Sequence, residues 1–272
     1  MGIEDTALAV TPPTAPHRAT WRAVAVPAEH GGWSLTAEPA VLGLLVAFSW
    51  PGSALGAAAM VAFLARTPLK VVLVDRGRHR WLDRTRVAAG IAAIELACLG
   101  ALVGFAVTAT AEKFWLPLAV AAPLVALELW YDMRSRGRRL IPELAGAIGI
   151  GSIATAIALA GGEAHRVAWG LWVVVAVRSA AAIPYVRVQI TRTRVRPLAR
   201  WTSDLAQLGA TGAVVAAWAA DLVPAAAAAA IVAIAAINMA AVRLPPRPAV
   251  VIGVQQTVFG IGVIVATAVA LT

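Results

Sequence analysis

The sequence is poor in charged residues and contains a single cysteine. Only 14% of its 272 residues are Asp, Glu, Lys or Arg, whereas about 25% is usual in soluble domains. Cys98 is the lone cysteine, which excludes a disulfide framework or a thiolate metal cluster within one chain. Because 60% of the residues are hydrophobic and the mean hydropathy is +0.79, we expect an integral membrane protein.

Apolar stretches of the length that a bilayer requires recur along the chain. A spanning helix needs about 17 to 25 predominantly apolar residues, and nine segments meet that requirement. We therefore predict an all-α polytopic membrane protein with nine transmembrane helices in one domain over residues 27–272. Eight spans is the alternative, because only Asp221 and Pro224 interrupt the last long apolar run before the C-terminal helix. The predicted limits are 34–50, 54–74, 87–109, 115–131, 143–160, 167–184, 204–220, 222–242 and 249–271.

The first 26 residues lack an apolar run. They combine scattered charges with a Pro-rich stretch at residues 11–16, a composition typical of a disordered tail and not of a cleaved signal peptide. We expect a disordered cytoplasmic tail over 1–26.

Basic residues are distributed unequally between the predicted loops. With nine spans and a cytoplasmic N-terminus, 21 of the 23 Lys and Arg residues lie on or towards the cytoplasmic side, and only Lys113 and Arg166 fall in the opposite loops. This asymmetry predicts a cytoplasmic N-terminus. It also attributes the net charge of +9 to contact with anionic lipid headgroups, so we expect no nucleic-acid partner.

Several charged and amide side chains fall inside predicted spans, mostly in the cytoplasmic half. Intramembrane charges are expensive, so they indicate either a polar cavity or ion pairs that tie helices together, such as Glu38 or Glu128 with Arg66 or Arg178. Arg66 and Lys70 are spaced to share one helix face and suit a phosphate or carboxylate. The set comprises Glu38, Arg66, Lys70, Glu95, Glu128, Glu143, Arg178, Gln207, Asn238, Gln255 and Gln256, and Asp132 directly follows the fourth span, four residues after Glu128.

The predicted loop after the second helix contains Asp75, His79 and Asp83 at intervals of four residues. If this segment is helical, the three side chains share one face and form a weak site for a divalent cation such as Mg²⁺. The alternative is a solvated loop held by salt bridges with its many arginines.

Two segments that precede predicted helices also carry polar groups. Glu29 and His30 stand before a diglycine at the start of the first helix, where either side chain could act as a base. Pro142 and Glu143 begin the fifth predicted helix, where a carboxylate also suits the positive end of the helix dipole.

Three of these segments carry a family resemblance. Pro27-Ala28-Glu29-His30-Gly31-Gly32-Trp33, the stretch from Arg66-Thr67-Pro68-Leu69-Lys70 to Asp75-Arg76, and Pro142-Glu143-Leu144-Ala145-Gly146 resemble signatures of the bacterial YwiC-like membrane proteins. The layout of that family is in turn similar to UbiA-type intramembrane prenyltransferases. That similarity implies nine helices, a cytoplasmic N-terminus and functional loops after helices two and six. The YwiC-like resemblance itself implies a protein of the bacterial inner membrane.

The UbiA resemblance implies roles for particular residues. The Asn-Asp-x-x-Asp-x-x-x-Asp motif of those enzymes corresponds to Asp75, Arg76, His79 and Asp83, and the Tyr-x-Asp-x-x-x-Asp motif to Tyr185, Arg187 and Thr191. Several magnesium-binding aspartates are thus absent, and arginine could neutralise an anionic headgroup directly.

These observations lead to two hypotheses. The first is a noncanonical UbiA-like transferase or lipid-modifying enzyme with a cytoplasm-facing pocket for an isoprenoid or other anionic-headed lipid. In it, Glu29 or His30 acts as base and Tyr185 orients the leaving oxygen; Arg66, Lys70, Arg178, Arg187, Glu128, Asp132, Glu143 and Gln255 line the substrate site, and Asp75, His79 and Asp83 form the weak metal site. The second is a non-catalytic protein, either a small-anion transporter or an assembly factor.

Overall fold

The computed structural model describes residues 21, 24–25, 30–134, 136–137, 139–192 and 198–272. Over these ranges the chain forms nine helices and no strand, which confirms the predicted all-α class and helix number. The predicted tail over 1–26 lies almost entirely outside the described residues. The helices are α2 (His30–Val46), α3 (Trp50–Gly77), α4 (Asp83–Ala109), α5 (Trp115–Met133), α6 (Leu140–Ala160), α7 (His165–Thr191), α8 (Arg200–Ala219), α9 (Ala225–Ala241) and α10 (Ala249–Leu271).

The long apolar run near the C-terminus is divided into α8 and α9, so it is not one continuous helix. Asp221 adopts a left-handed backbone conformation with φ of 51°, which ends the helical hydrogen bonding. Pro224 then precedes the first residue of α9 in an extended conformation. These two residues are the ones that interrupt the hydropathy pattern.

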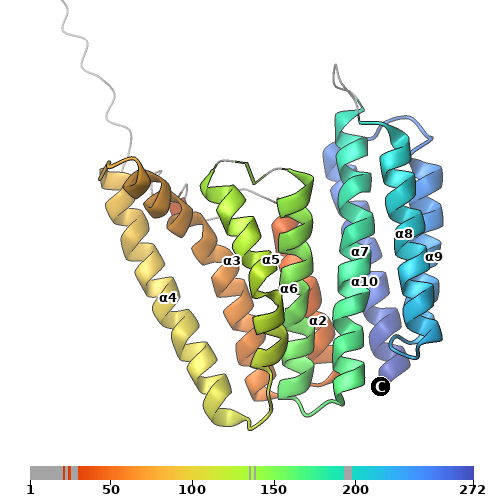
Figure 1. Cartoon of the computed structure of the whole chain (residues 1–272), viewed down its shortest axis with the longest axis horizontal. Coiled ribbons are helices and arrows are strands. Elements are labelled where there is room, and N and C mark those ends of the chain that lie inside the picture. The colour runs from red at the N-terminus through yellow and green to blue at the C-terminus, as the bar shows by residue number, and fades with distance from the viewer. Residues whose placement is uncertain (1–20, 22–23, 26–29, 135, 138, 193–197) are drawn as a thin grey trace, which may run out of the picture.

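Successive helices run in alternate directions, and their connections gather at two ends of the bundle (Figure 1). Helices α3, α5, α7 and α9 end, and helices α4, α6, α8 and α10 begin, at the end drawn at the top, which we call the basic end. The α2–α3, α4–α5, α6–α7 and α8–α9 connections lie at the opposite end, together with the C-terminus. Thus the arginine-rich connections share one end, in agreement with the sequence prediction.

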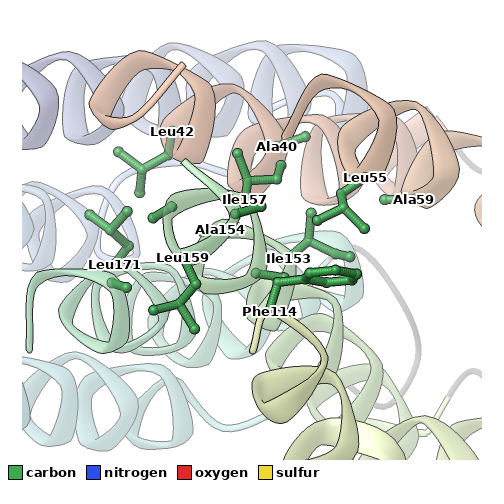
Figure 2. Packing of buried hydrophobic residues seen from close by; sticks show 14 of the residues in the cluster. Ala40, Leu42, Leu55, Ala59, Phe114, Ile153, Ala154, Ile157, Leu159 and Leu171 are labelled. Atoms are coloured by element: carbon green, nitrogen blue, oxygen red, sulfur yellow. The ribbon is translucent and has the colours of Figure 1, made fainter. Parts of the chain in front are cut away.

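Helix α6 forms the centre of the largest apolar core. Figure 2 shows its residues Ile153, Ile157 and Leu159 among side chains from α2, α3 and α7. Gly43 lets α2 approach this helix closely, because a Cβ atom there would lie 2.9 Å from the Ala154 carbonyl oxygen. Small residues allow this close van der Waals packing, which holds helices together where lipid provides no hydrophobic effect between them.

Six helices are long and apolar enough to cross a bilayer, namely α3, α4, α5, α6, α7 and α10, within the part of the chain that the structure describes. Helix α9 and the segment Gly32–Val46 of α2 are shorter apolar helices, and α8 starts with the polar sequence Arg200–Asp204. Helix α4 packs extensively on α3 alone, and most of its surface is exposed, as expected of a lipid-facing helix. The fold is that of a multi-pass membrane protein.

Several helices extend further towards the basic end than predicted. Helix α7 continues to Thr191, so Tyr185 and Arg187 are helical and do not belong to the predicted loop after helix six. Arg178 therefore occupies the middle of α7 instead of its last part. The hydropathy pattern places the end of a helix at its first polar residues. Backbone hydrogen bonding does not depend on hydropathy, so the helix itself continues further.

Candidate functional site

An ion pair is buried halfway along the bundle. Glu38 and Arg178 are the middle residues of α2 and α7, and Arg178 Nη1 lies 2.8 Å from Glu38 Oε2. The two residues are only 7% and 6% exposed. Arg178 Nη2 donates to the backbone oxygen of Gln256 on α10 at 2.5 Å, whereas Nε is buried without a hydrogen-bond partner. The guanidinium therefore joins three helices, and its Nε donor is not used.

A glycine on α10 provides the space for this pair. A Cβ atom at Gly260 would overlap the carboxylate of Glu38 and would lie 2.5 Å from Arg178 Nη2. The charged groups thus approach the α10 backbone at a position where any larger residue would clash. Both charges stay enclosed by protein because this position lacks a side chain.

A chain of amide side chains continues from the same region through the C-terminal helices. Gln256 Nε2 donates to Asn238 Oδ1 at 3.2 Å, and Asn238 Nδ2 lies 3.4 Å from Gln207 Oε1. Gln207 Nε2 donates to the Ala181 carbonyl oxygen at 2.8 Å. Asn238 and Gln207 are completely buried, so α7, α8, α9 and α10 enclose a continuous polar path. We call these three side chains the amide chain.

A small cavity adjoins the ion pair and the amide chain. It measures about 10 Å³ and is lined by Arg178, Asn238 and Gln256 together with apolar residues of α7 and α9. This volume is at the lower limit for one water molecule. Gln255, a predicted substrate ligand, is the neighbour of Gln256, and its Oε1 atom is buried without a hydrogen-bond partner.

A second charged group joins α3 to α5 nearer the basic end. Arg66 contacts Asp132 at 2.6 Å and Glu128 at 2.8 Å, and Lys70 Nζ lies 3.3 Å from Asp132. The side chains of Arg66 and Lys70 are 29% and 43% exposed. We call these four residues the α3–α5 charge cluster. The structure brings together four predicted substrate ligands, and it confirms the ion-pair interpretation for Arg66 and Glu128.

The proposed metal ligands do not converge. Helix α3 ends at Gly77, and His79 has a left-handed backbone with φ of 53°, so the segment is not one helix with a shared face. Asp75 is buried and bound by Arg84 at 2.9 Å and by the Thr85 hydroxyl at 2.7 Å. Asp83 is exposed and lies 3.6 Å from Arg86. No group of three or more His, Cys, Asp or Glu within the described ranges has the geometry of a metal site, and magnesium binding stays a prediction.

The remaining predicted residues fall in different surroundings. Arg187 pairs with Glu143 at 2.7 Å and joins α7 to α6 near the basic end. Tyr185 is 1% exposed and packs with Val188 and residues of α9 and α10, and its hydroxyl accepts a hydrogen bond from Gln189. Its side chain thus belongs to the core.

The proposed bases cannot be placed beside these groups. Glu29 lies outside the described residues, and His30 is described only as the first residue of α2. Their assignment stays a prediction.

Another cavity lies at the opposite end of the bundle. It has a volume of about 320 Å³ and is bordered by Arg166, Gly170, Trp218, Asp221 and Leu271, which come from α7, the segment 218–225 and the end of α10. The sequence predicted a pocket that opens at the basic end instead. The sequence did not predict this cavity because its lining residues come from three segments that are distant in the chain. Only two of these segments contribute a charged residue.

The helices and their alternating arrangement define a multi-pass membrane protein. Residues 26–158 match the family model described as YwiC-like protein, so the chain is YwiC-like over a segment that amounts to just under half its length. This segment includes Glu38 and the α3–α5 charge cluster, whereas Arg178 and the amide chain follow it. No curated protein and no solved structure matches the chain. The similarity to UbiA-type enzymes stays a prediction.

Proposed function

We propose that this YwiC-like membrane protein transports a small anion through a site at Arg178. The observation that carries the proposal is a guanidinium buried at the middle of α7 with an unpartnered Nε donor, next to a cavity the size of a water molecule. An arginine offers several fixed donors to an anion. A charge at this depth is expensive in lipid, and charges of this kind commonly mark substrate or ion pathways.

The surroundings of Arg178 support a path along α7 and α10. Asn238 and Gln256 line the same small cavity and can donate amide hydrogens to an anion. The 320 Å³ cavity at the opposite end is bordered by the same two helices. Arg166, at its edge, precedes Arg178 by about 18 Å of helix, at 1.5 Å per residue. An anion that enters this cavity and moves along α7 therefore meets Arg166 first and Arg178 last.

Anion uptake into proteoliposomes tests the proposal. The purified protein is reconstituted, and uptake of chloride and inorganic phosphate is measured against protein-free vesicles. We expect wild-type uptake and a loss of at least tenfold in Arg178→Gln, because the neutral side chain cannot balance the anion. Arg243→Gln is the matched control, since Arg243 pairs with Asp204 at the basic end. Absence of uptake by the wild type, or equal uptake by Arg178→Gln, would overturn the proposal.

We also propose that the basic end faces the cytoplasm of a bacterial plasma membrane. The support is the concentration of arginine in the four connections at that end, which the positive-inside rule assigns to the cytoplasm. In a Cys98→Ala background, Glu112→Cys at the opposite end should react with an impermeant thiol reagent on intact cells, and Arg80→Cys should not. The reverse pattern would invert the orientation.

A noncanonical UbiA-like transferase acting on an anionic-headed lipid is the second candidate function. It is favoured by the α3–α5 charge cluster, whose two cations lie partly exposed near the basic end. Thermal-shift measurements with prenyl diphosphates and other anionic lipids, with and without Mg²⁺, test this function. Stabilisation that Arg66→Ala abolishes would support it, and unchanged binding by that variant would exclude the cluster as the headgroup site.

A further inference from the structure

We infer that anion transport is coupled to the uptake of one proton by Glu38, which makes the protein an electroneutral proton–anion symporter. The inference rests on the proposed transport function and deepens it. Its basis is the one-to-one pairing of Glu38 with Arg178, enclosed by protein in the middle of two helices.

The first step of the argument is the charge of the site. Arg178 contributes one positive charge and Glu38 one negative charge, so the pair is neutral. If an anion joined this pair without a proton, the site would carry an uncompensated negative charge. An uncompensated buried charge costs several kcal/mol in a low-dielectric interior, so a proton that neutralises Glu38 removes most of this cost.

The other titratable residues on the neighbouring helices do not replace Glu38 as the proton acceptor. Helices α9 and α10 contain no titratable residue within their described bounds. On α6, Glu143 pairs with Arg187, and on α3 the cations Arg66 and Lys70 pair with Asp132. The other titratable residues on the helices packed against α2 and α7 are His30, Asp75, Arg76, His165, Arg166, Tyr185, Arg200 and Asp204.

These other groups lie towards the ends of the bundle or are engaged elsewhere. Asp75 binds Arg84, and Asp204 binds Arg243. The remaining ones occupy terminal turns, apart from Tyr185, which lies two turns further along α7 and is hydrogen-bonded to Gln189. Glu38 is thus the proton acceptor that directly contacts the anion-binding guanidinium.

The exchange step balances in charge and in bonds. A proton binds the Glu38 carboxylate, and the ionic bond between this carboxylate and Arg178 Nη1 breaks. The anion then takes the position on Nη1 that the carboxylate vacates. The site changes from carboxylate plus guanidinium to neutral acid plus guanidinium plus anion, so its net charge is zero before and after. Release of the anion and the proton restores the ion pair.

A simultaneous measurement of anion uptake and internal pH tests the coupling. Proteoliposomes contain a trapped pH-sensitive dye, and valinomycin with potassium fixes the membrane potential. With chloride as the probe, we expect internal acidification of one proton per anion in the wild type, and an uptake rate that does not change with the potential. Asp204→Asn removes a carboxylate from an arginine pair near the basic end and should behave as the wild type.

Glu38→Gln is the decisive variant because glutamine has the shape of the protonated acid. We expect anion movement to continue without acidification and to become dependent on the potential. Glu38→Asp keeps a titratable group and should retain the coupling at a lower rate, which provides a second measurement if the glutamine variant fails to fold.

The outcomes separate the coupling from transport itself. Wild-type anion uptake without acidification, or acidification that persists in Glu38→Gln, overturns the coupling and leaves transport intact. Absence of uptake of both chloride and phosphate at every pH gradient overturns the transport function.

Discussion

The buried pair of Glu38 with Arg178 and the α3–α5 charge cluster are built alike but differ in their solvation. In each, an arginine on one helix binds a carboxylate on another, and a glycine on a third segment leaves space for that carboxylate: Gly260 beside Glu38 and Gly146 beside Glu128. The cluster has two cations, two anions and partial exposure, so water and its other members can compensate for the loss of one charge. The buried pair has neither form of compensation.

The largest effect is expected from removal of Arg178. Arg178→Ala leaves Glu38 buried without its cation, which should lower the free energy of unfolding by about 3–5 kcal/mol. Chemical denaturation in detergent micelles measures this loss. The double variant Arg178→Ala with Glu38→Gln should regain a substantial part of it, because no unpaired charge remains. Equal stability of the single and double variants would show that the charge is compensated elsewhere.

A smaller loss is expected when the space beside the pair is filled. Gly260→Ala introduces a Cβ atom that overlaps the Glu38 carboxylate, and such overpacking costs about 1–3 kcal/mol. Gly262→Ala on the same helix is the matched control, since a Cβ there meets no atom within 4 Å. The comparison of the two variants by the same denaturation measurement isolates the packing effect from helix propensity. A similar change in both would contradict it.

The charge cluster should tolerate the loss of its arginine better. Arg66→Ala is expected to cost about 1–2 kcal/mol, a value between those for exposed and buried pairs, because Lys70 still contacts Asp132 and the site is partly solvated. This loss should grow at low salt concentration and shrink at high salt concentration. A cost as large as that of Arg178→Ala would remove the contrast between the two regions.

The smallest effect is expected at the pair of Asp204 with Arg243, because the Arg243 side chain is 54% exposed. The Arg243 guanidinium donates hydrogen bonds to the Asp204 carboxylate, which raises the pKa of Arg243 above its ordinary value. An ion pair whose cation is exposed to solvent contributes little to folding. Asp204→Asn should therefore unfold at the same denaturant concentration as the wild type within experimental error. A clear loss would show that solvation does not decide the order of these four effects.

Much of the architecture could be predicted from the sequence, whereas the site could be predicted only in part. Glu128 and Asp132, four residues apart, share a helix face, as do Arg66 and Lys70, and the two faces meet in the structure. The predicted convergence of Asp75, His79 and Asp83 does not occur, because it required one helix through Gly77 and His79, and α3 ends at Gly77. Tyr185 was assigned to a loop because the length of α7 depends on backbone continuity and not on hydropathy.

The sequence by itself determined the nine helices and the gathering of arginine at one end, because hydropathy and charge are properties of each segment alone. The sequence left open whether Glu38 pairs with Arg66 or with Arg178. Only the tertiary structure decided this choice: α2 packs against α7 and α10, the two middle residues lie at one level, and Gly260 leaves space for their charges. Such a pairing depends on the rotation and order of helices distant in the chain, which no local pattern specifies.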